Sequence, residues 1–223
     1  MNSVLLSLSA LLAASVLAAP AAAAAPADGR PAAAVPAGWE ALDGAELAAM
    51  ADGEGARQAP FAASPDGAAA TSAAEEELIV MQSERNGRFV ATEVTYPAPH
   101  TGVLRARSTD VGGWETLAFE WDETTESHAI RSTANGLYVA VEKNLTGASQ
   151  NVLRARSTSV GGWERFTVYY NEELDLWALQ SQLNGLFVAM ENSYTGSLQY
   201  VLRARSADVG GSWEQFRLYG LEG

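Results

Sequence analysis

Short segments of alternating hydrophobic and polar residues fill the chain from about residue 77 onward, and they recur three times. The hexapeptide Val-Leu-Arg-Ala-Arg-Ser begins at Val103, Val152 and Val201, and a tryptophan follows each copy. Because successive side chains of a strand point to opposite faces, the leucine and alanine share one face and the two arginines share the other. We expect the leucine face to lie in the core. No window keeps an apolar period of 3.6 residues, so the pattern predicts strands.

A second phrase stands before each hexapeptide and opens with an Asn-Gly pair, at Asn86, Asn135 and Asn184. Asn-Gly is the preferred two-residue turn of a β-hairpin. Each repeat of about 49 residues therefore holds four strands. In the second repeat they are expected at 127–132, 137–142, 152–157 and 164–170. Twelve short strands with threefold sequence symmetry predict an all-β fold, a closed β-trefoil.

The repeats occupy residues 77–223, and the rest of the chain differs in composition. Repeat boundaries are expected at about 77–125, 126–174 and 175–223. Residues 1–25 are apolar, rich in alanine and end in Ala-x-Ala triplets, which is typical of a signal peptide. We therefore expect a secreted, extracellular protein with no membrane span once the signal peptide is removed.

Residues 26–76 are dominated by alanine, proline and glycine, so we expect a disordered linker or a propeptide. A short stretch within this segment could form one or two turns of helix with Trp39, Leu42 and Met50 near one face. An isolated helix of this length is marginal in water, so the disordered tether is the preferred interpretation.

The net charge is −13 at pH 7, of which −8 falls on residues 75–223. Nucleic acid and anionic membrane surfaces are therefore not expected as partners, because both require a basic face. The chain has no cysteine, so an exported domain must be stabilised by its packed core rather than by disulfides.

Acidic residues repeat with the strands, as Glu93, Glu142 and Glu191 show. A carboxylate that recurs in every copy is better explained as a structural partner than as half of a catalytic pair, because catalytic carboxylates need different environments. We predict that each one pairs with arginines of the next strand on the same sheet surface. Those arginines are Arg105 and Arg107, Arg154 and Arg156, and Arg203 and Arg205.

Aromatic residues also recur. Trp114, Trp163 and Trp213 each follow a glycine-rich bend, and we expect the three rings to close the bottom layer of the core. A second set lies at the ends of the fourth strands, where at least one member should be exposed. This set comprises Trp121, Tyr169, Tyr170 and Tyr219.

Catalytic and metal-binding groups are scarce, with two histidines and no known catalytic motif. His128 stands where the other copies have Ile79 and Trp177, so we expect a partly buried packing residue whose ring nitrogens are satisfied. His100 lies in a loop without an acidic neighbour, and a metal site needs more ligands. We therefore expect no enzyme activity, no cofactor and no metal.

The phrases Asn-Gly-x-(Tyr/Phe)-Val-Ala-x-Glu, Leu-x-Ala-x-Arg and Gly-Gly-Trp-Glu-x-Phe resemble the repeat signature of the fascin-like domain, a β-trefoil of the actin-crosslinking superfamily. The likeness covers 86–119, 135–168 and 184–218. It implies either actin-filament bundling, as in animal fascins with four such trefoils, or an accessory trefoil of secreted bacterial proteins, for which glycan binding is the usual suggestion. Actin is itself acidic, so the negative charge favours the second use. The Q-x-W signature of ricin-type lectins is absent.

Candidate ligand-binding residues lie in the loops between the second and third strands, at 95–102, 144–151 and 193–200, because loops vary over a constant scaffold. Aromatic faces beside amide groups suit a sugar ring and its hydroxyls. The candidates are Gln150, Asn151, Tyr194, Gln199 and Tyr200, although ordinary exposed loop residues would look the same. We expect a monomeric, non-catalytic module that binds a glycan or polysaccharide or mediates surface adhesion, with actin binding or a protein-interaction scaffold as alternatives.

Overall fold

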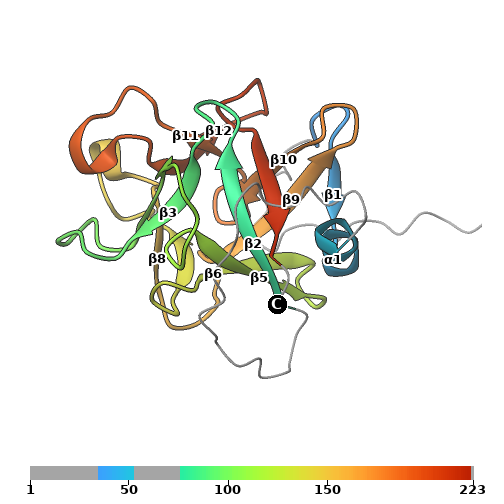
Figure 1. Ribbon diagram of the computed structural model, residues 1–223, viewed down its shortest axis with the longest axis horizontal. Helices are drawn as coiled ribbons and strands as arrows, with labels where there is room; N and C mark the ends of the chain where they lie inside the picture. The colour runs from blue at the N-terminus through green and yellow to red at the C-terminus, as the bar shows by residue number, and fades with distance from the viewer. Residues whose placement is uncertain (1–34, 53–75, 222–223) are drawn as a thin grey trace, which may run out of the picture. The chain divides into compact units, whose positions relative to one another are not determined.

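All strands of the described residues belong to one sheet that closes on itself. The computed structural model describes residues 35–52 and 76–221 (Figure 1). The strands are β1 (Glu40–Leu42), β2 (Glu76–Ser83), β3 (Phe89–Glu93), β4 (Val103–Ser108), β5 (Thr116–Asp122), β6 (Ser127–Ser132), β7 (Tyr138–Val141), β8 (Leu153–Ser157), β9 (Arg165–Asn171), β10 (Leu176–Ser181), β11 (Phe187–Met190), β12 (Leu202–Ser206) and β13 (Phe216–Gly220). The helices are α1 (Gly44–Asp52) and two 3-10 turns, η1 (Gly147–Ser149) and η2 (Gly196–Leu198).

The first and fourth strands of each repeat build a barrel. Strand β2 pairs with β13 and β5, β6 pairs with β5 and β9, and β10 pairs with β9 and β13, so the ring of six strands is closed. The second and third strands form three hairpins, β3–β4, β7–β8 and β11–β12. Six barrel strands and three hairpins define a β-trefoil, as the sequence predicts.

The core confirms the alternation within the repeated hexapeptide. Leu104, Leu153 and Leu202 are fully buried in the main hydrophobic cluster, with the alanines two residues later. The Asn-Gly strand has valine and an aromatic residue on opposite faces. Its valines line the barrel, whereas Phe89 and Phe187 belong to separate clusters outside it. The sequence alone left this choice open.

Residues 39–52 fold onto the trefoil, which corrects the expectation of a disordered linker over this stretch. Strand β1 lies beside β9 and pairs with it antiparallel (Figure 1). Helix α1 packs Leu47 into the main core. Trp39 and Leu42 are also buried. A helix this short is stable here because the barrel covers its apolar face, so tertiary packing replaces the missing intrinsic stability.

A capping box starts α1. The Asp43 side chain accepts a hydrogen bond from the Glu46 N–H at 2.8 Å, and the Glu46 side chain accepts one from the Asp43 N–H at 2.9 Å. Two N–H groups at the start of the helix that have no intrahelical partner are thereby satisfied. The predicted signal peptide 1–25 and the remaining parts of the 26–76 segment lie outside the described residues. Within the described ranges, no helix is long and apolar enough to cross a membrane.

Candidate functional site

The five predicted loop residues fall into two groups related by the threefold symmetry. Gln150 and Asn151 lie beside Arg203, whose Nε donates to the Gln150 carbonyl at 2.8 Å and whose guanidinium also bonds the Tyr194 hydroxyl. The second group lies beside the first repeat and contains Gln199 and Tyr200.

Arg105 organises that second group. Its Nε donates to the Gln199 carbonyl at 2.6 Å, and its guanidinium bonds the hydroxyl of Tyr96, the counterpart of Tyr194. Asn151 and Tyr200 both have positive φ, and the N–H of Ala204 and of Ala106 donates to their respective carbonyls. The loops thus tie neighbouring repeats together, and the predicted residues do not converge on a single site.

The predicted pairing of glutamates with arginines is present in all three repeats. Glu93, Glu142 and Glu191 are buried, and each carboxylate is bound by both arginines of the next strand. The inner arginines differ in exposure, from 7% at Arg105 to 21% at Arg154. These clusters are structural, because their charges already satisfy one another.

The three repeated tryptophans are not in the core, which corrects that prediction. Trp114 is 37% exposed, and Trp163 and Trp213 are half-buried. The following glutamates are buried instead, and the Glu115 carboxylate accepts a hydrogen bond from the Gly112 N–H at 3.0 Å. Burial raises the pKa of Glu115. Strand alternation counted back from the buried Leu117 places position 115 inward and position 114 outward.

The two histidines have structural surroundings. His100 joins the three loops, because its Nε2 lies 3.1 Å from Ser149 Oγ and its Nδ1 lies 2.7 Å from Ser197 Oγ. His128 is buried as predicted, at 1% exposure, but neither ring nitrogen has a hydrogen-bond partner. The expectation of a satisfied ring was therefore wrong. Its ring packs on Trp121 with centroids 4.7 Å apart, and burial lowers the pKa of His128 to about 4.

Two of the three junctions between repeats are filled by aromatic pairs. Phe89 packs against Tyr219, with ring centroids 6.2 Å apart, and Phe187 packs against Tyr169 at 5.6 Å. Each tyrosine hydroxyl donates to a glutamine side chain, from Tyr219 to Gln82 and from Tyr169 to Gln180. Tyr169 and Tyr219 are buried and the other two fourth-strand aromatics are half-buried, so the prediction that at least one would be exposed is wrong.

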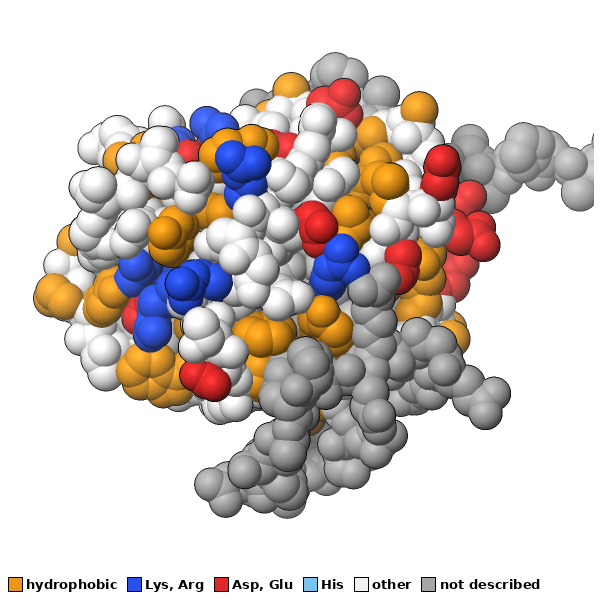
Figure 2. All heavy atoms as spheres, turned by 45° about the horizontal axis from the view of Figure 1, so that its top comes forward, with side chains coloured by type: hydrophobic (Ala, Val, Ile, Leu, Met, Phe, Trp, Pro, Cys, Tyr) orange, Lys and Arg blue, Asp and Glu red, His pale blue; other side chains and the backbone are white. Residues whose placement is uncertain are grey.

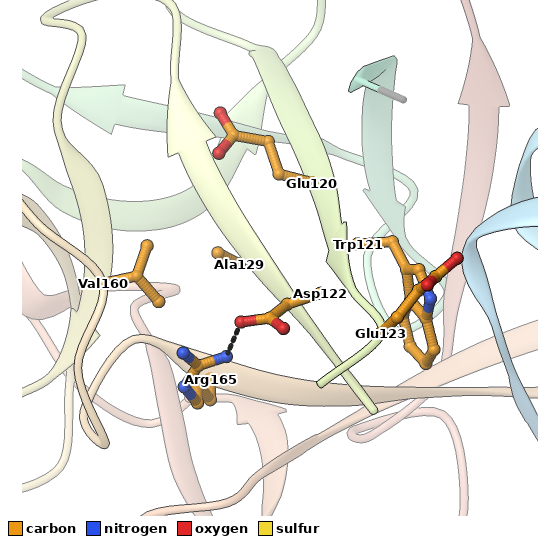
Figure 3. A pocket seen from close by; sticks show the side chains of 7 residues that line it. All are labelled: Glu120, Trp121, Asp122, Glu123, Ala129, Val160 and Arg165. Atoms are coloured by element: carbon orange, nitrogen blue, oxygen red, sulfur yellow. Dashed lines mark hydrogen bonds and ion pairs between the residues drawn. The ribbon is translucent and has the colours of Figure 1, made fainter. Parts of the chain in front are cut away.

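The third junction is polar and holds no aromatic pair. At its equivalent positions, Glu120 replaces the tyrosine and Arg131 replaces the glutamine, while Tyr138 replaces the phenylalanine. A hollow of about 420 Å³ lies there between β5, β6 and β9. This volume is within the range of small-ligand sites. Figure 3 shows the hollow and its lining residues, which are Glu120, Trp121, Asp122, Glu123, Ala129, Val160 and Arg165.

The lining combines charged groups with a small apolar surface. Asp122 and Arg165 point toward one another and form an ion pair at 2.9 Å, with Ala129 and Val160 on the same side of β5 (Figure 3). The hydrogen bond from Arg165 lowers the pKa of Asp122, so this carboxylate is ionised and accepts hydrogen bonds at neutral pH.

Glu120 is held in place by two donors. Arg131 Nε donates to its Oε1 at 2.9 Å, and the Tyr138 hydroxyl donates to its Oε2 at 2.8 Å. Burial, together with the bond to Glu120, raises the pKa of Tyr138. Among the described residues, no group of three or more His, Cys, Asp or Glu side chains is placed to hold a metal ion.

Sequence reasoning missed this hollow, although the repeats contain the signal. When the three repeats are aligned, Glu120 stands at the position that Tyr169 and Tyr219 occupy in the other two. This one acidic residue among aromatic ones marks the third junction.

Known structures support the fold. No protein-family model matches the chain, and no curated protein sequence resembles it closely enough to count as a match. The chain is similar to the designed threefold-symmetric protein ThreeFoil, with a TM-score of 0.53 and 17% identity over 65% of this chain and 99% of that one. Such low identity shows a shared β-trefoil fold alone.

Two other solved structures are also similar to this chain. The Rhizoctonia solani agglutinin gives a TM-score of 0.50 and 10% identity over 69% of this chain and its own entire length. A GlcNAcα1-4Gal-releasing endo-β-galactosidase from Clostridium perfringens gives a TM-score of 0.51 and 9% identity over 66% of this chain. The chain spans only 33% of that enzyme. Binding proteins and parts of larger enzymes thus share the fold.

Proposed function

We propose that the protein is a secreted, monomeric and non-catalytic carbohydrate-binding module of the fascin-like type, and that the hollow is its sugar site. The observation that carries this proposal is the hollow beside the polar third junction, because an aromatic pair takes the place of its polar residues in the other two. A packed trefoil does not need a polar hollow here for stability. The similarity to an agglutinin is consistent with binding as the general function.

The chemistry of the hollow suits a sugar. Carboxylate oxygens of Asp122 accept hydrogen bonds from neighbouring hydroxyls, and Arg165 donates to hydroxyl and ring oxygens. Ala129 and Val160 offer apolar contact to the C–H face of the ring. With carboxylates at Glu120, Asp122 and Glu123, the hollow favours a neutral sugar over an acidic one.

A binding role fits the hollow better than glycoside cleavage. Cleavage requires a carboxylic acid with a raised pKa near a second carboxylate. Here the pKa of Asp122 is lowered, and Glu120 is occupied by Arg131 and Tyr138. Glu115 has a raised pKa but is buried against its own turn.

The test is retention of the purified protein on insoluble cellulose, chitin, xylan and cell-wall glycan, with filamentous actin pelleted in the same buffer. The key variant is E120Y/R131Q, which introduces the tyrosine–glutamine pair of the other two junctions. Its circular dichroism spectrum and thermal unfolding are compared with those of the wild type to show that it folds. We expect the wild type to be retained and the variant to lose at least about tenfold in affinity, or about 1.4 kcal/mol, because the tyrosine ring fills space that the sugar would occupy.

Loop variants provide the matched comparison. Tyr194→Ala and Tyr200→Ala should leave binding unchanged if the hollow is the site. Loss of retention in these variants, with E120Y/R131Q unaffected, would move the site to the loops. Co-sedimentation with actin and no retention on any glycan would replace the proposal with the fascin-type alternative. No binding in either assay would favour a protein-interaction scaffold.

A further inference from the structure

The first repeat carries two arginines that differ from all others in the described part of the chain. Every other described arginine forms an ion pair with a carboxylate, whereas Arg85 and Arg88 have none within 4.0 Å. Both flank the Asn-Gly turn between β2 and β3. The corresponding positions are Ala134 and Leu137 in the second repeat and Leu183 and Leu186 in the third.

The surroundings of these arginines are aromatic and basic. The Arg85 guanidinium lies 4.2 Å from the ring centroid of Trp213. The Glu84 N–H donates to the Gln215 carbonyl at 3.0 Å, and this bond fixes the turn beside the Trp213 segment. Stacking on an indole holds a guanidinium in one orientation while leaving its N–H groups available for a ligand.

Arg88 extends the same surface toward a second tryptophan. Its Nη1 donates to the Arg107 carbonyl at 3.0 Å. The Arg107 guanidinium lies 5.9 Å from the ring centroid of Trp114, which is 37% exposed. These contacts extend on either side of one turn, from Trp213 and Arg85 to Arg88, Arg107 and Trp114, and the five residues are here called the basic strip.

Neither Glu84 nor Glu93 is paired with Arg85 or Arg88. Glu84 is bound by Arg217 at 2.7 Å, and Glu93 is buried beneath Arg105 and Arg107. Arg85 is exposed and Arg88 half-buried. The protein surface does carry local groups of basic side chains beside hydrophobic ones despite the negative total charge, as the face in Figure 2 shows.

We propose that the basic strip is a second binding site, distinct from the hollow, for the carboxylate or sulfate groups of an anionic polysaccharide. Arg85 and Arg88 bind the anionic groups, and the open ring of Trp114 stacks on a sugar. Charges farther away than about 8 Å are largely screened at physiological salt, so the total charge does not prevent local binding. It does disfavour nucleic acid and anionic membranes, which contact a wide basic face.

The site is tested with immobilised polygalacturonate as a carboxylate probe, dextran sulfate as a sulfate probe and dextran as the neutral reference. The variant R85A/R88L introduces the second repeat's own Ala-Asn-Gly-Leu turn, so it should fold. We expect a loss of about tenfold or more in affinity for at least one anionic probe, the charge-assisted bonds being strong. The probe affected identifies the anionic group.

Lys143→Glu is the charge-matched control, because it changes the net charge by the same amount at an exposed residue in another loop. This control should keep wild-type affinity within about twofold, as expected for a distant surface charge. Equal losses in both variants, unchanged binding by R85A/R88L, or equal affinity for dextran would each overturn the proposal. The variant E120Y/R131Q should bind the anionic probes with wild-type affinity. The experiments can therefore contradict the proposal for the hollow and the proposal for the basic strip independently of each other.

Discussion

Gly44 lies directly against Trp121, since a Cβ atom at position 44 would stand 2.6 Å from the Trp121 Cβ. The close approach joins the start of α1 to β5. Trp121 in turn packs on His128, so one contact connects the segment before the repeats to a buried part of the barrel.

Gly44→Ala should therefore destabilise the protein even though alanine favours helices. Overpacking of this kind costs about 1–3 kcal/mol. Urea unfolding measures the change, and Gly162→Ala is the control because a Cβ there meets nothing within 4 Å. Equal stability of the two variants would mean that α1 does not dock on Trp121.

Leu47→Ala tests whether α1 belongs to the folded domain. Leu47 is 3% exposed within the main core, and truncating such a residue lowers the free energy of unfolding by about 2–5 kcal/mol. Val35→Ala should change it by less than about 0.5 kcal/mol, because Val35 is 53% exposed. A Leu47→Ala variant as stable as the wild type would restore the interpretation of this segment as a tether.

The composition of residues 26–76 explains why the sequence predicts a linker here. Alanine, proline and glycine dominate that region, and the few large apolar residues, Trp39, Leu42, Leu47 and Met50, cannot stabilise a short helix without a partner surface. The capping pair Asp43 and Glu46 was a readable signal for the start of α1. The barrel that completes its apolar face could not be seen locally.

His128 should make stability depend on pH. Its pKa is about 4 in the folded protein and 6.5 when unfolded, so the unfolded chain binds the proton more tightly. The contribution of neutral His128 to the free energy of unfolding is fully present above about pH 6.5. It falls by about 3 kcal/mol as the pH is lowered to about 4.

His128→Ile is the matched variant, because the first repeat has Ile79 at the same position. Its free energy of unfolding should fall less between about pH 7 and pH 4 than that of the wild type, with the difference near the value given above. Chemical denaturation at both pH values measures it. Parallel pH profiles would show that His128 is not buried as a neutral ring.

The glutamate–arginine clusters should differ in strength. Removing the charge of a buried partner costs about 3–5 kcal/mol where the remaining arginine is also buried. We expect Glu93→Gln to be the most destabilising and Glu142→Gln the least, because Arg105 is 7% exposed and Arg154 is 21% exposed. Unfolding by urea ranks the variants, and the reverse order would contradict the burial argument.

The fold, its repeats and these ion pairs follow from the sequence because period-two alternation and turn chemistry are local. The prediction that Trp114 lies in the core is wrong because a glycine-rich bend precedes it, so the alternation of the earlier strand does not continue to this residue. Counted back from Leu117, the alternation places Trp114 on the outer face. The hollow depends on which side chains meet across a junction between repeats. The sequence shows that Glu120 differs from the equivalent residues of the other repeats. That this difference removes an aromatic pair is clear only once the packing of Tyr169 and Tyr219 is known.

The most direct test of the central claim is an NMR titration of the ¹⁵N-labelled protein with the soluble oligosaccharide of whichever polysaccharide retains it. The account predicts amide shifts at the hollow, in residues 120–129 and 160–165, that saturate with sugar. Shifts confined to loops 144–151 and 193–200, or no shifts at all, would contradict the assignment of the hollow as the sugar site.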